Sequence, residues 1–184
     1  MQIITGKYRA RKLVAVKGET TRPTLARVKE SVFNLIQGRV ENSVVLDLFA
    51  GSGAFGVECV SRGAKKVFFV DSAPEAIKTI KINTKNMTED FEILNKDFES
   101  ALESFSSKKL KFDLVYLDPP YKSDYAIKAL NTLQKMDLLQ NGATIVVEHE
   151  FKNDLQNLDE CYIIEKSRKY GIAFVDILKF IPKE

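Results

Sequence analysis

The 184-residue sequence predicts an α/β fold with a mostly parallel seven-stranded sheet that ends in an antiparallel C-terminal hairpin, with one reversed edge strand. Three observations predict this fold. Short apolar runs of strand length alternate with segments of helical periodicity along most of the chain. The runs are almost continuously apolar, which is typical of strands covered on both faces. The last two runs meet around Tyr170–Gly171 without room for a helix, so they must pair antiparallel.

Strands and helices are expected to alternate from residue 40 to the C-terminal hairpin. We predict strands at Val44–Leu48, Val67–Val70, Phe91–Leu94, Phe112–Leu117, Ala143–Val147, Tyr162–Glu165 and Ile172–Phe180. Helices are predicted at Ala54–Arg62, Phe98–Phe105 and Tyr125–Met136. A further helix opens at SAPE, where Ser72 and Glu75 have the spacing of a capping box. The Asn141–Gly142 pair predicts a turn before the fifth strand.

The first 39 residues differ in charge from the rest of the chain. They carry nine basic and two acidic residues, a net +7, whereas the remainder carries nineteen basic and twenty-three acidic ones, a net −4. We expect a small hairpin or an extended lead-in, followed by a helix over Leu25–Gln37, whose apolar face packs on the sheet and leaves Arg27 and Lys29 for solvent or a partner. A basic arm (residues 1–39) before a domain (residues 40–184) favours a polyanionic partner, most commonly nucleic acid.

The composition is that of an ordinary globular protein, with 45% hydrophobic and 29% charged residues. No apolar run approaches the roughly 18 residues of a membrane helix. The N-terminus also lacks the apolar block of a signal peptide, so a cytoplasmic protein is expected. Cys59 and Cys161 lie far apart and are expected to be reduced core residues. With a single histidine besides, no metal site is expected.

An aspartate stands at the end of each of four successive predicted strands. These are Asp47, Asp71, Asp97 and Asp118. Open parallel sheets bind their ligands in the crevice at the carboxyl ends of the strands. One such aspartate is commonly only a helix cap or a turn residue, but four together predict a binding rim.

The first strand runs into the stretch LDLFAGSGAFG, in which Gly51, Gly53 and Gly56 have the G-x-G-x-x-G spacing of a dinucleotide site. A pyrophosphate on this loop would lie beside Asp47, and the two would repel each other strongly once desolvated. The loop has no Lys or Arg to offset that repulsion. The charge therefore favours a cationic cofactor, S-adenosylmethionine (SAM), and leaves an NAD-dependent dehydrogenase as a less favoured alternative.

The residues around the loop can be matched to the parts of SAM. Gly51 and Gly53 let the backbone approach the methionine part, and Asp47 balances its ammonium. Asp71 is expected to bind the ribose hydroxyls, as an acidic residue after the second strand does for adenosine ligands. Asp97 would accept from the adenine amino group. The other cofactor candidates adjoin these residues: Phe49, Ser72, and Phe98, which would pack on the adenine ring.

The fourth strand ends in a second motif, Asp118-Pro119-Pro120-Tyr121. Two prolines fix the backbone and remove two N–H donors, so the Pro119 carbonyl can point into the site as an acceptor. A carboxylate and a carbonyl that both accept from one exocyclic NH₂ would hold its lone pair toward an electrophile, with Tyr121 stacked on the ring. The motif therefore predicts methyl transfer to a planar amine.

These motifs resemble the RsmD family, bacterial SAM-dependent methyltransferases of guanine N2 in small-subunit (16S) ribosomal RNA, within the class I D/N-PPY amino-methyltransferases. The stretches that carry the resemblance are GKYRARKL at Gly6–Leu13, RPT at Arg22–Thr24, VKESVFNLI at Val28–Ile36, VLDLFAGSGAFGVECVSRGA at Val45–Ala64, FDLVYLDPPY at Phe112–Tyr121, and YG at Tyr170–Gly171. The resemblance implies a Rossmann-like methyltransferase fold. It also implies SAM without a metal, and a monomer that acts on ribosomal RNA, free or in an assembling small subunit.

The resemblance further implies roles for residues outside the rim. The arm and the RPT stretch would close over the cofactor and dock RNA. Arg22 is the contact that the resemblance names there, and Arg9, Arg11 and Lys12 are the other basic candidates. Glu148, at the end of the fifth strand, would line the target pocket.

Two other classes of function stay open. One is an amino-methyltransferase of another substrate, such as adenine N6 in DNA or RNA or a protein glutamine amide, because the motif tolerates all of these amines. The other is a non-catalytic RNA-binding protein on the same fold, which the complete DPPY motif disfavours. His149, next to Glu148, has no predicted partner and is expected to be structural or exposed.

Overall fold

The computed structural model describes the chain except residues 18–22, 121–123, 150–154, 156–157 and 184. Among the described residues the helices are α1 (Pro23–Leu35), α2 (Ala54–Ser61), α3 (Pro74–Asn83), α4 (Phe98–Ser107) and α5 (Tyr125–Lys135). The strands are β1 (Val44–Leu48), β2 (Lys66–Asp71), β3 (Phe91–Asn95), β4 (Phe112–Leu117), β5 (Leu139–His149), β6 (Tyr162–Tyr170) and β7 (Ala173–Phe180). Each predicted strand is present, so the predicted α/β class is confirmed.

The strands form one sheet in the order β3-β2-β1-β4-β5-β7-β6. Strands β1 to β5 run parallel, and β7 is antiparallel to both β5 and β6, which confirms the predicted hairpin. The prediction that the reversed strand lies at the edge is wrong, because β7 is inserted beside β5 and β6 forms the edge. The reason is burial: Val175, Ile177 and Leu178 of β7 are fully buried, whereas most of β6 is exposed.

Strands β5 and β6 are longer than predicted. Gly142, with φ +82°, lies inside β5 and not in a turn before it. It falls where the pairing of β5 with β4 shifts register between Phe112 and Leu114. Strand β6 continues to Tyr170 although most of its side chains are exposed. The apolar pattern does not predict either extension, because most of the added side chains are exposed. Backbone pairing continues along both strands although these side chains are not buried.

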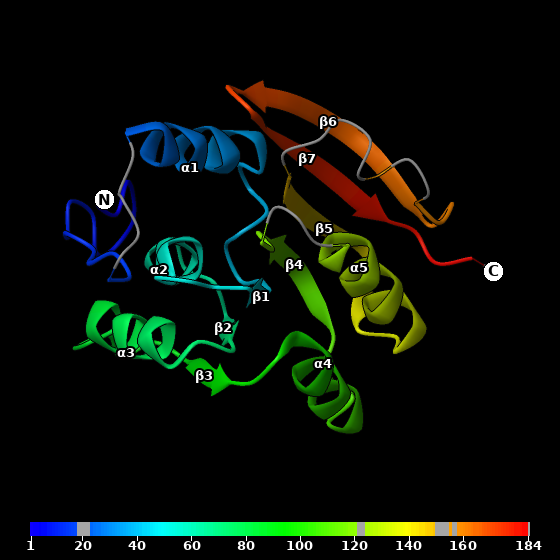
Figure 1. Ribbon diagram of the computed structural model, residues 1–184, viewed down its shortest axis with the longest axis horizontal. Coiled ribbons are helices and arrows are strands. Elements are labelled where there is room, and N and C mark those ends of the chain that lie inside the picture. The colour runs from blue at the N-terminus through cyan, green and yellow to red at the C-terminus, as the bar shows by residue number, and fades with distance from the viewer. Residues whose placement is uncertain (18–22, 121–123, 150–154, 156–157, 184) are drawn as a thin grey trace.

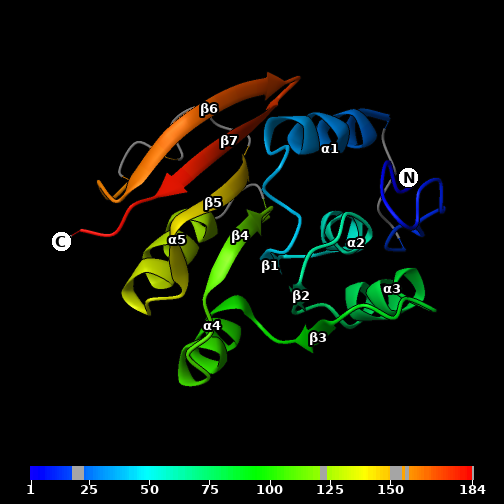
Figure 2. The same cartoon turned by 180° about the vertical axis from the view of Figure 1, so that it is seen from behind.

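Helices cover both faces of the sheet. Figure 1 shows α1, α2 and α3 on one face and α4 and α5 on the other, and Figure 2 shows from behind that the two chain ends lie on opposite sides. One core cluster includes Leu102 and Phe105 of α4 and Leu130 of α5. The other includes Val32 of α1 and Ile80 of α3. The strand order reverses between β1 and β4, which places the ligand crevice of such a sheet at their carboxyl ends.

Two predicted helix starts are wrong in detail. Helix α1 begins at Pro23, two residues before the predicted start at Leu25, because the fixed φ of proline suits a first helical turn. Helix α3 has no capping box. Its N-cap is Ala73, whose N–H donates to Asp71 Oδ1 at 2.8 Å. Asp71 therefore accepts from the N–H of the N-cap residue, which is the role that a capping box would give to Glu75.

The N-terminal arm is packed onto the domain. Near its start Gln2 pairs antiparallel with Lys12, which gives the small hairpin rather than an extended lead-in, and Ile3 is fully buried. Gly6 has φ +91°, and a Cβ there would lie 1.8 Å from the Ser61 carbonyl oxygen, so only glycine fits. The Ser61 hydroxyl also holds the arm: it accepts from the Tyr8 N–H at 3.0 Å and donates to the Thr5 carbonyl at 2.7 Å.

A buried carboxylate joins the arm, α1 and α2. Glu58 is fully buried and accepts from the backbone N–H groups of Ile4 at 2.8 Å and Thr5 at 3.0 Å. Lys29 donates to it at 2.7 Å and is only 7% exposed, so the prediction that Lys29 faces solvent or a partner is wrong. Lys29 turns inward because Glu58 supplies a counter-charge that helical periodicity does not reveal. Arg62 adds a further charged hydrogen bond at 2.9 Å.

We predict that Glu58→Gln lowers the free energy of unfolding by about 3 kcal/mol or more, because it leaves the buried Lys29 ammonium without its counter-charge. Urea unfolding at neutral pH measures this. Glu103→Gln, an exposed carboxylate on α4, is the matched control and should change stability by less than about 0.5 kcal/mol. Equal unfolding midpoints for the two variants would show that the buried pair does not hold the arm.

Candidate active site

A cavity of about 1190 Å³ opens along the carboxyl ends of the strands. This volume is enough for a cofactor together with part of a second ligand. The predicted site residues that line it are Phe49, Gly51, Asp71, Ser72, Asp97, Phe98, Asp118, Pro119, Pro120 and Glu148. The structure therefore gathers residues from the ends of five strands around one hollow.

The turn from β1 into α2 forms the floor of this cavity. Three of its residues have positive φ: Phe49 at +66°, Gly51 at +52° and Gly53 at +72°. A non-glycine residue such as Phe49 in this region is strained, and such strain gathers at functional sites. Gly51 lines the cavity, whereas Gly53 lies behind it as the N-cap of α2. Gly56 serves packing, since a Cβ there would lie 2.3 Å from the Phe69 ring.

Asp47 lies beneath this turn and does not line the cavity. It is 1% exposed, and its Oδ2 accepts from the Gly56 N–H at 2.9 Å. Its Oδ1 is buried and has no hydrogen-bond partner in the described part of the chain. Burial raises the pKa of Asp47 to about 8, and the charge of Asp71 adds to this while the Gly56 N–H opposes it. An unpaired buried carboxylate oxygen under a glycine turn is the kind of group that a cationic ligand would stabilise.

Asp71 and Asp97 line the cavity and also hold backbone in place. Asp71 Oδ2 accepts from the Gly51 N–H at 2.8 Å, so the end of β2 fixes the glycine turn after β1. Asp97 caps α4 by accepting from the Ser100 N–H at 2.9 Å and the Ser100 hydroxyl at 2.8 Å. The bond from the Ser100 N–H keeps the pKa of Asp97 below its usual value. Both carboxylates are therefore fixed at the rim by hydrogen bonds from backbone N–H groups.

An aromatic wall stands beside these two carboxylates. The Phe98 ring lies 5.4 Å from that of Phe49 and 5.3 Å from that of Tyr125, measured between centroids. All three residues line the cavity, and Phe98 is largely buried. Tyr125 was not predicted as a site residue, because it reads as the first residue of an amphipathic helix. The wall can pack against a planar ring.

The second motif enters the cavity from the end of β4. Asp118, Pro119 and Pro120 line the cavity directly after β4, and Tyr121 lies outside the described residues. The register pairs Leu117 of β4 with Leu48 of β1 and with Val147 of β5, so β1 and β4 end level and β5 continues for two more residues. The motif therefore stands between the glycine turn and the end of β5.

A buried pair of polar side chains lies next to the motif. Glu148 is 4% exposed, lines the cavity, and accepts a short hydrogen bond from the Tyr116 hydroxyl. Burial raises the pKa of Glu148, and this bond acts in the opposite sense. The Tyr116 ring is stacked on Phe55, with centroids 4.1 Å apart. Tyr116 was missed from the sequence, although it shares the face of β4 on which Asp118 follows two residues later.

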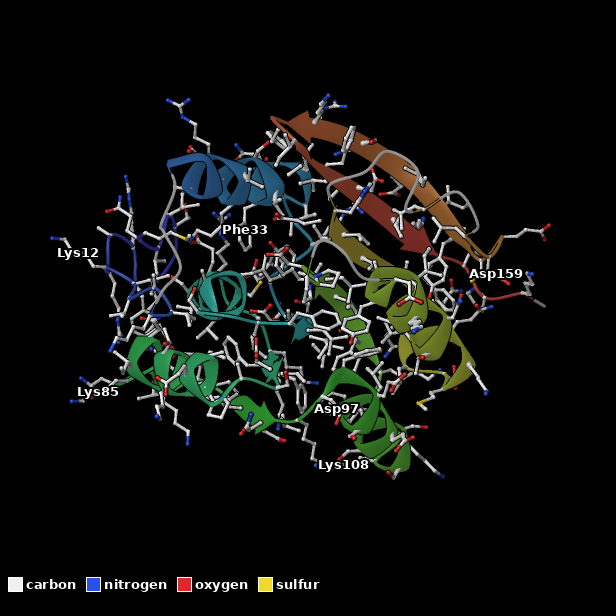
Figure 3. The ribbon with its side chains drawn as sticks, viewed as in Figure 1. Lys12, Phe33, Lys85, Asp97, Lys108 and Asp159 are labelled. Carbon is white, nitrogen blue, oxygen red and sulfur yellow. The ribbon has the colours of Figure 1, made fainter. Side chains whose placement is uncertain are left out.

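The basic candidates of the arm lie outside the cavity. Arg11 donates to the Lys85 carbonyl at 2.6 Å, and Arg9 lines a smaller hollow beside Arg27. Figure 3 shows Lys12 at the outer edge of the arm, well apart from Asp97 at the start of α4. Arg22 is another predicted contact and lies outside the described residues. None of Arg9, Arg11 and Lys12, all described, lines the main cavity, so their predicted contact with RNA stays a prediction.

Other predicted features are internal. His149 is buried and contacts Asp176, with Nε2 and Oδ2 2.9 Å apart, so it has a partner that the sequence did not suggest. Cys59 and Cys161 are buried free cysteines, as predicted. Among the described residues, no three His, Cys, Asp or Glu side chains gather as metal ligands. No described helix has the length and apolar character to span a membrane.

Comparisons with known proteins identify relatives over nearly the whole chain. A family model described as conserved hypothetical protein 95 matches residues 1–179. A candidate rRNA methyltransferase of Bacillus subtilis is 38% identical, over 97% of this chain and 98% of its own. Ribosomal RNA small subunit methyltransferase D of Haemophilus influenzae is 37% identical, over 94% of this chain and 90% of its own. A solved candidate methyltransferase from Escherichia coli has a TM-score of 0.85 at 26% identity and covers 100% of this chain and 99% of its own.

The buried Asp47 predicts a pH dependence of stability. A carboxyl whose pKa is about 8 in the folded chain and 3.8 otherwise destabilises the fold as pH rises from about 4 to 8, because the unfolded chain releases its proton first. We therefore expect the free energy of unfolding to fall over this range relative to that of Asp47→Asn, by at most about 1.4 kcal/mol per pH unit. Parallel urea titrations of the two proteins measure the difference. A difference independent of pH would contradict the shifted pKa.

Proposed function

The chain belongs to the family of conserved hypothetical protein 95, which confirms its predicted resemblance to the RsmD methyltransferases, and from this premise we propose a specific reaction. The protein transfers a methyl group from SAM to the exocyclic N2 amine of a guanine in small-subunit (16S) ribosomal RNA. The observation that carries the proposal is the placement of Asp118, Pro119 and Pro120 in one cavity with the glycine turn. Relatives of nearly the same length are named as rRNA methyltransferases, which supports rRNA as the substrate.

The cavity fits SAM on charge as well as on size. The orphaned Oδ1 of Asp47 and the backbone of Gly51 would serve the methionine part, whose ammonium offsets the buried carboxylate. Asp71 and Ser72 would hold the ribose. Asp97 would meet the adenine amino group. The other cofactor contacts are the rings of the aromatic wall: Phe49, Phe98 and Tyr125.

When bound, SAM supplies an electrophilic methyl group on a sulfonium. Asp118 and the Pro119 carbonyl accept from the two hydrogens of the target amine, which turns the nitrogen lone pair toward that methyl group. They also stabilise the positive charge that develops on the nitrogen during the transfer. The base must leave its stack to reach the cavity, which costs least in a loop. Tyr121 would stack on the base.

The arm supplies the contact with RNA in this proposal. Residues 1–39 carry the net positive charge, and Arg9, Arg11, Lys12 and Arg22 would contact phosphates away from the reacting base. Their place outside the cavity suits such a role, since phosphate contacts set orientation and not the choice of base. The remaining residues, 40–184, form the methyltransferase domain. The enzyme acts in the cytoplasm as a monomer without a metal.

We predict that Asp118→Ala lowers the methyl-transfer rate by about 100-fold or more, because it removes one of two acceptors that orient the amine. The dissociation constant for SAM, measured by calorimetry, should stay within about threefold. Asp137→Ala, an exposed residue after α5, is the matched control. Loss of SAM binding in Asp118→Ala would place this carboxylate in the cofactor site and contradict its proposed role.

Asp71→Ala should show the reverse pattern. We expect the SAM dissociation constant to rise by about 10- to 100-fold, since the variant loses the ribose acceptor and the hydrogen bond to Gly51. Saturating SAM should restore much of the transfer rate. Calorimetry with SAM and with NADH on the same protein sample measures the dissociation constant of each cofactor. Tight NADH binding without SAM binding to the unaltered protein would favour a dehydrogenase and overturn the proposed function.

A further inference from the structure

The cavity has two halves that the sheet order keeps apart. The ends of β1, β2 and β3 supply the residues proposed for SAM. The half on the other side of Asp118, here called the acceptor half, is lined by Val28 of α1, Phe55 of α2, Tyr116 of β4, Glu148 of β5, and Ile172 before β7. Among the described residues, the side chains that line this half are apolar except those of Tyr116 and Glu148 and the ammonium of Lys29, which is paired with Glu58. Those two groups are therefore placed to recognise an acceptor base.

Glu148 and Asp118 occupy matching positions on neighbouring strands. Leu117 pairs with Val147, so the next residues along the chain are Asp118, directly after β4, and Glu148 on β5. Neighbouring strands lie about 4.8 Å apart. Tyr116 pairs with Val146, and side chains of one strand alternate between faces, so Tyr116 and Glu148 lie on the same face of the sheet. A base whose amine is held at Asp118 would present the next atoms of the same edge to Glu148.

One oxygen of the Glu148 carboxylate is hydrogen-bonded within the described part of the chain, and the other can accept from a ligand. Its Oε1 accepts from the Tyr116 hydroxyl, which is the one hydrogen bond it makes among the described residues. The Tyr116 ring is held by its stacking on Phe55, so the phenol orients the carboxylate within the cavity wall. Oε2 remains to accept one N–H from a ligand. A buried acceptor of this kind strongly favours a ligand that brings a donor to it.

The edges of the bases differ at the atom beside the amine. In guanine the N2 amine lies between two ring nitrogens, N3 and N1, and N1, on the Watson–Crick edge, carries a hydrogen. In adenine and cytosine the ring nitrogen next to the amine carries a lone pair, which a carboxylate repels. We propose that Glu148, oriented by Tyr116, accepts the guanine N1–H and thereby selects guanine over adenine and cytosine. This role rests on the proposed function and makes Glu148 a specificity-determining residue, while Asp118 and Pro119 position the amine.

The test replaces the carboxylate by its amide. In Glu148→Gln the Tyr116 hydroxyl should retain the amide oxygen, which turns the NH₂ group toward the base. That NH₂ group is a donor, so it cannot accept from guanine N1–H, but it can donate to adenine N1. The substrates are small-subunit rRNA and purified small subunits from cells that lack the protein, with guanine or adenine at the nucleotide that the unaltered enzyme methylates. Transfer is measured by mass spectrometry of the nucleosides.

We expect Glu148→Gln to lower kcat/KM on guanine by about 10- to 100-fold and to reduce the guanine-to-adenine ratio by at least as much. Tyr116→Phe should lower kcat/KM on guanine by a smaller factor and should not raise kcat/KM on adenine. Both variants should bind SAM as the unaltered protein does and keep its melting temperature within a few degrees. Glu103→Gln, away from the cavity on α4, should match the unaltered enzyme.

Three results would overturn the inference. One is an unchanged guanine-to-adenine ratio in Glu148→Gln while the unaltered enzyme methylates guanine. The second is a loss of SAM binding in Glu148→Gln, which would place the residue in the cofactor half. The third is a preference of the unaltered enzyme for adenine, as a protonated Glu148 that donates to N1 would produce. If the unaltered enzyme binds SAM and methylates neither base in either substrate, the proposed function fails as well, and the two failures are thereby distinguished.

Discussion

The structure of the site depends on how two carboxylates hold one turn. Asp47 at the end of β1 accepts from the Gly56 N–H, and Asp71 at the end of β2 accepts from the Gly51 N–H. Between Asp47 and Gly56 the chain passes through three residues of positive φ, including Phe49. These two hydrogen bonds hold the strained turn in its conformation. Asp71 also lines the cavity and Asp47 lies buried beneath the turn, so the arrangement that holds the turn also places two carboxyl groups at the proposed cofactor site.

The charge of this arrangement explains why the glycine pattern does not imply a dinucleotide. Asp47 is buried and has an unpaired oxygen, and its pKa of about 8 reflects the cost of ionising it there. A phosphate would raise that cost, whereas an ammonium would lower it. The glycine spacing is common to both kinds of site. The residue before the glycines favours a cationic cofactor on charge, which makes local electrostatics a better guide than the spacing.

Much of the fold follows from local pattern, and much of the rim follows from topology. Apolar runs predict β1 and β4 with the observed bounds. Because parallel strands share one carboxyl edge, the order of the chain alone brings Asp71, Asp97 and Asp118 to one cavity. What the pattern misses are contacts between residues far apart in sequence. Lys29 reads as an exposed helical lysine because its partner Glu58 lies in another helix.

The acceptor half was predictable only in part, for the same reason. Glu148 is a candidate because it stands at the end of a predicted strand, but its burial is not evident from that position, and its partner Tyr116 reads as an ordinary strand residue. His149 likewise finds Asp176 across the β5–β7 pairing. The predicted start of β5 is wrong because the exposed residues Gln140, Asn141 and Gly142 belong to the strand. Local sequence therefore predicts which residues reach the rim better than it predicts what each one touches.

We propose that this cavity methylates guanine N2 in small-subunit rRNA. The most direct test is mass spectrometry of nucleosides from small-subunit rRNA of cells that lack the protein, compared with the same cells carrying it. We predict the loss of one N2-methylguanosine and its return when the protein is restored. An unchanged set of modified nucleosides, or the loss of a methyl group from an adenine instead, would contradict the account.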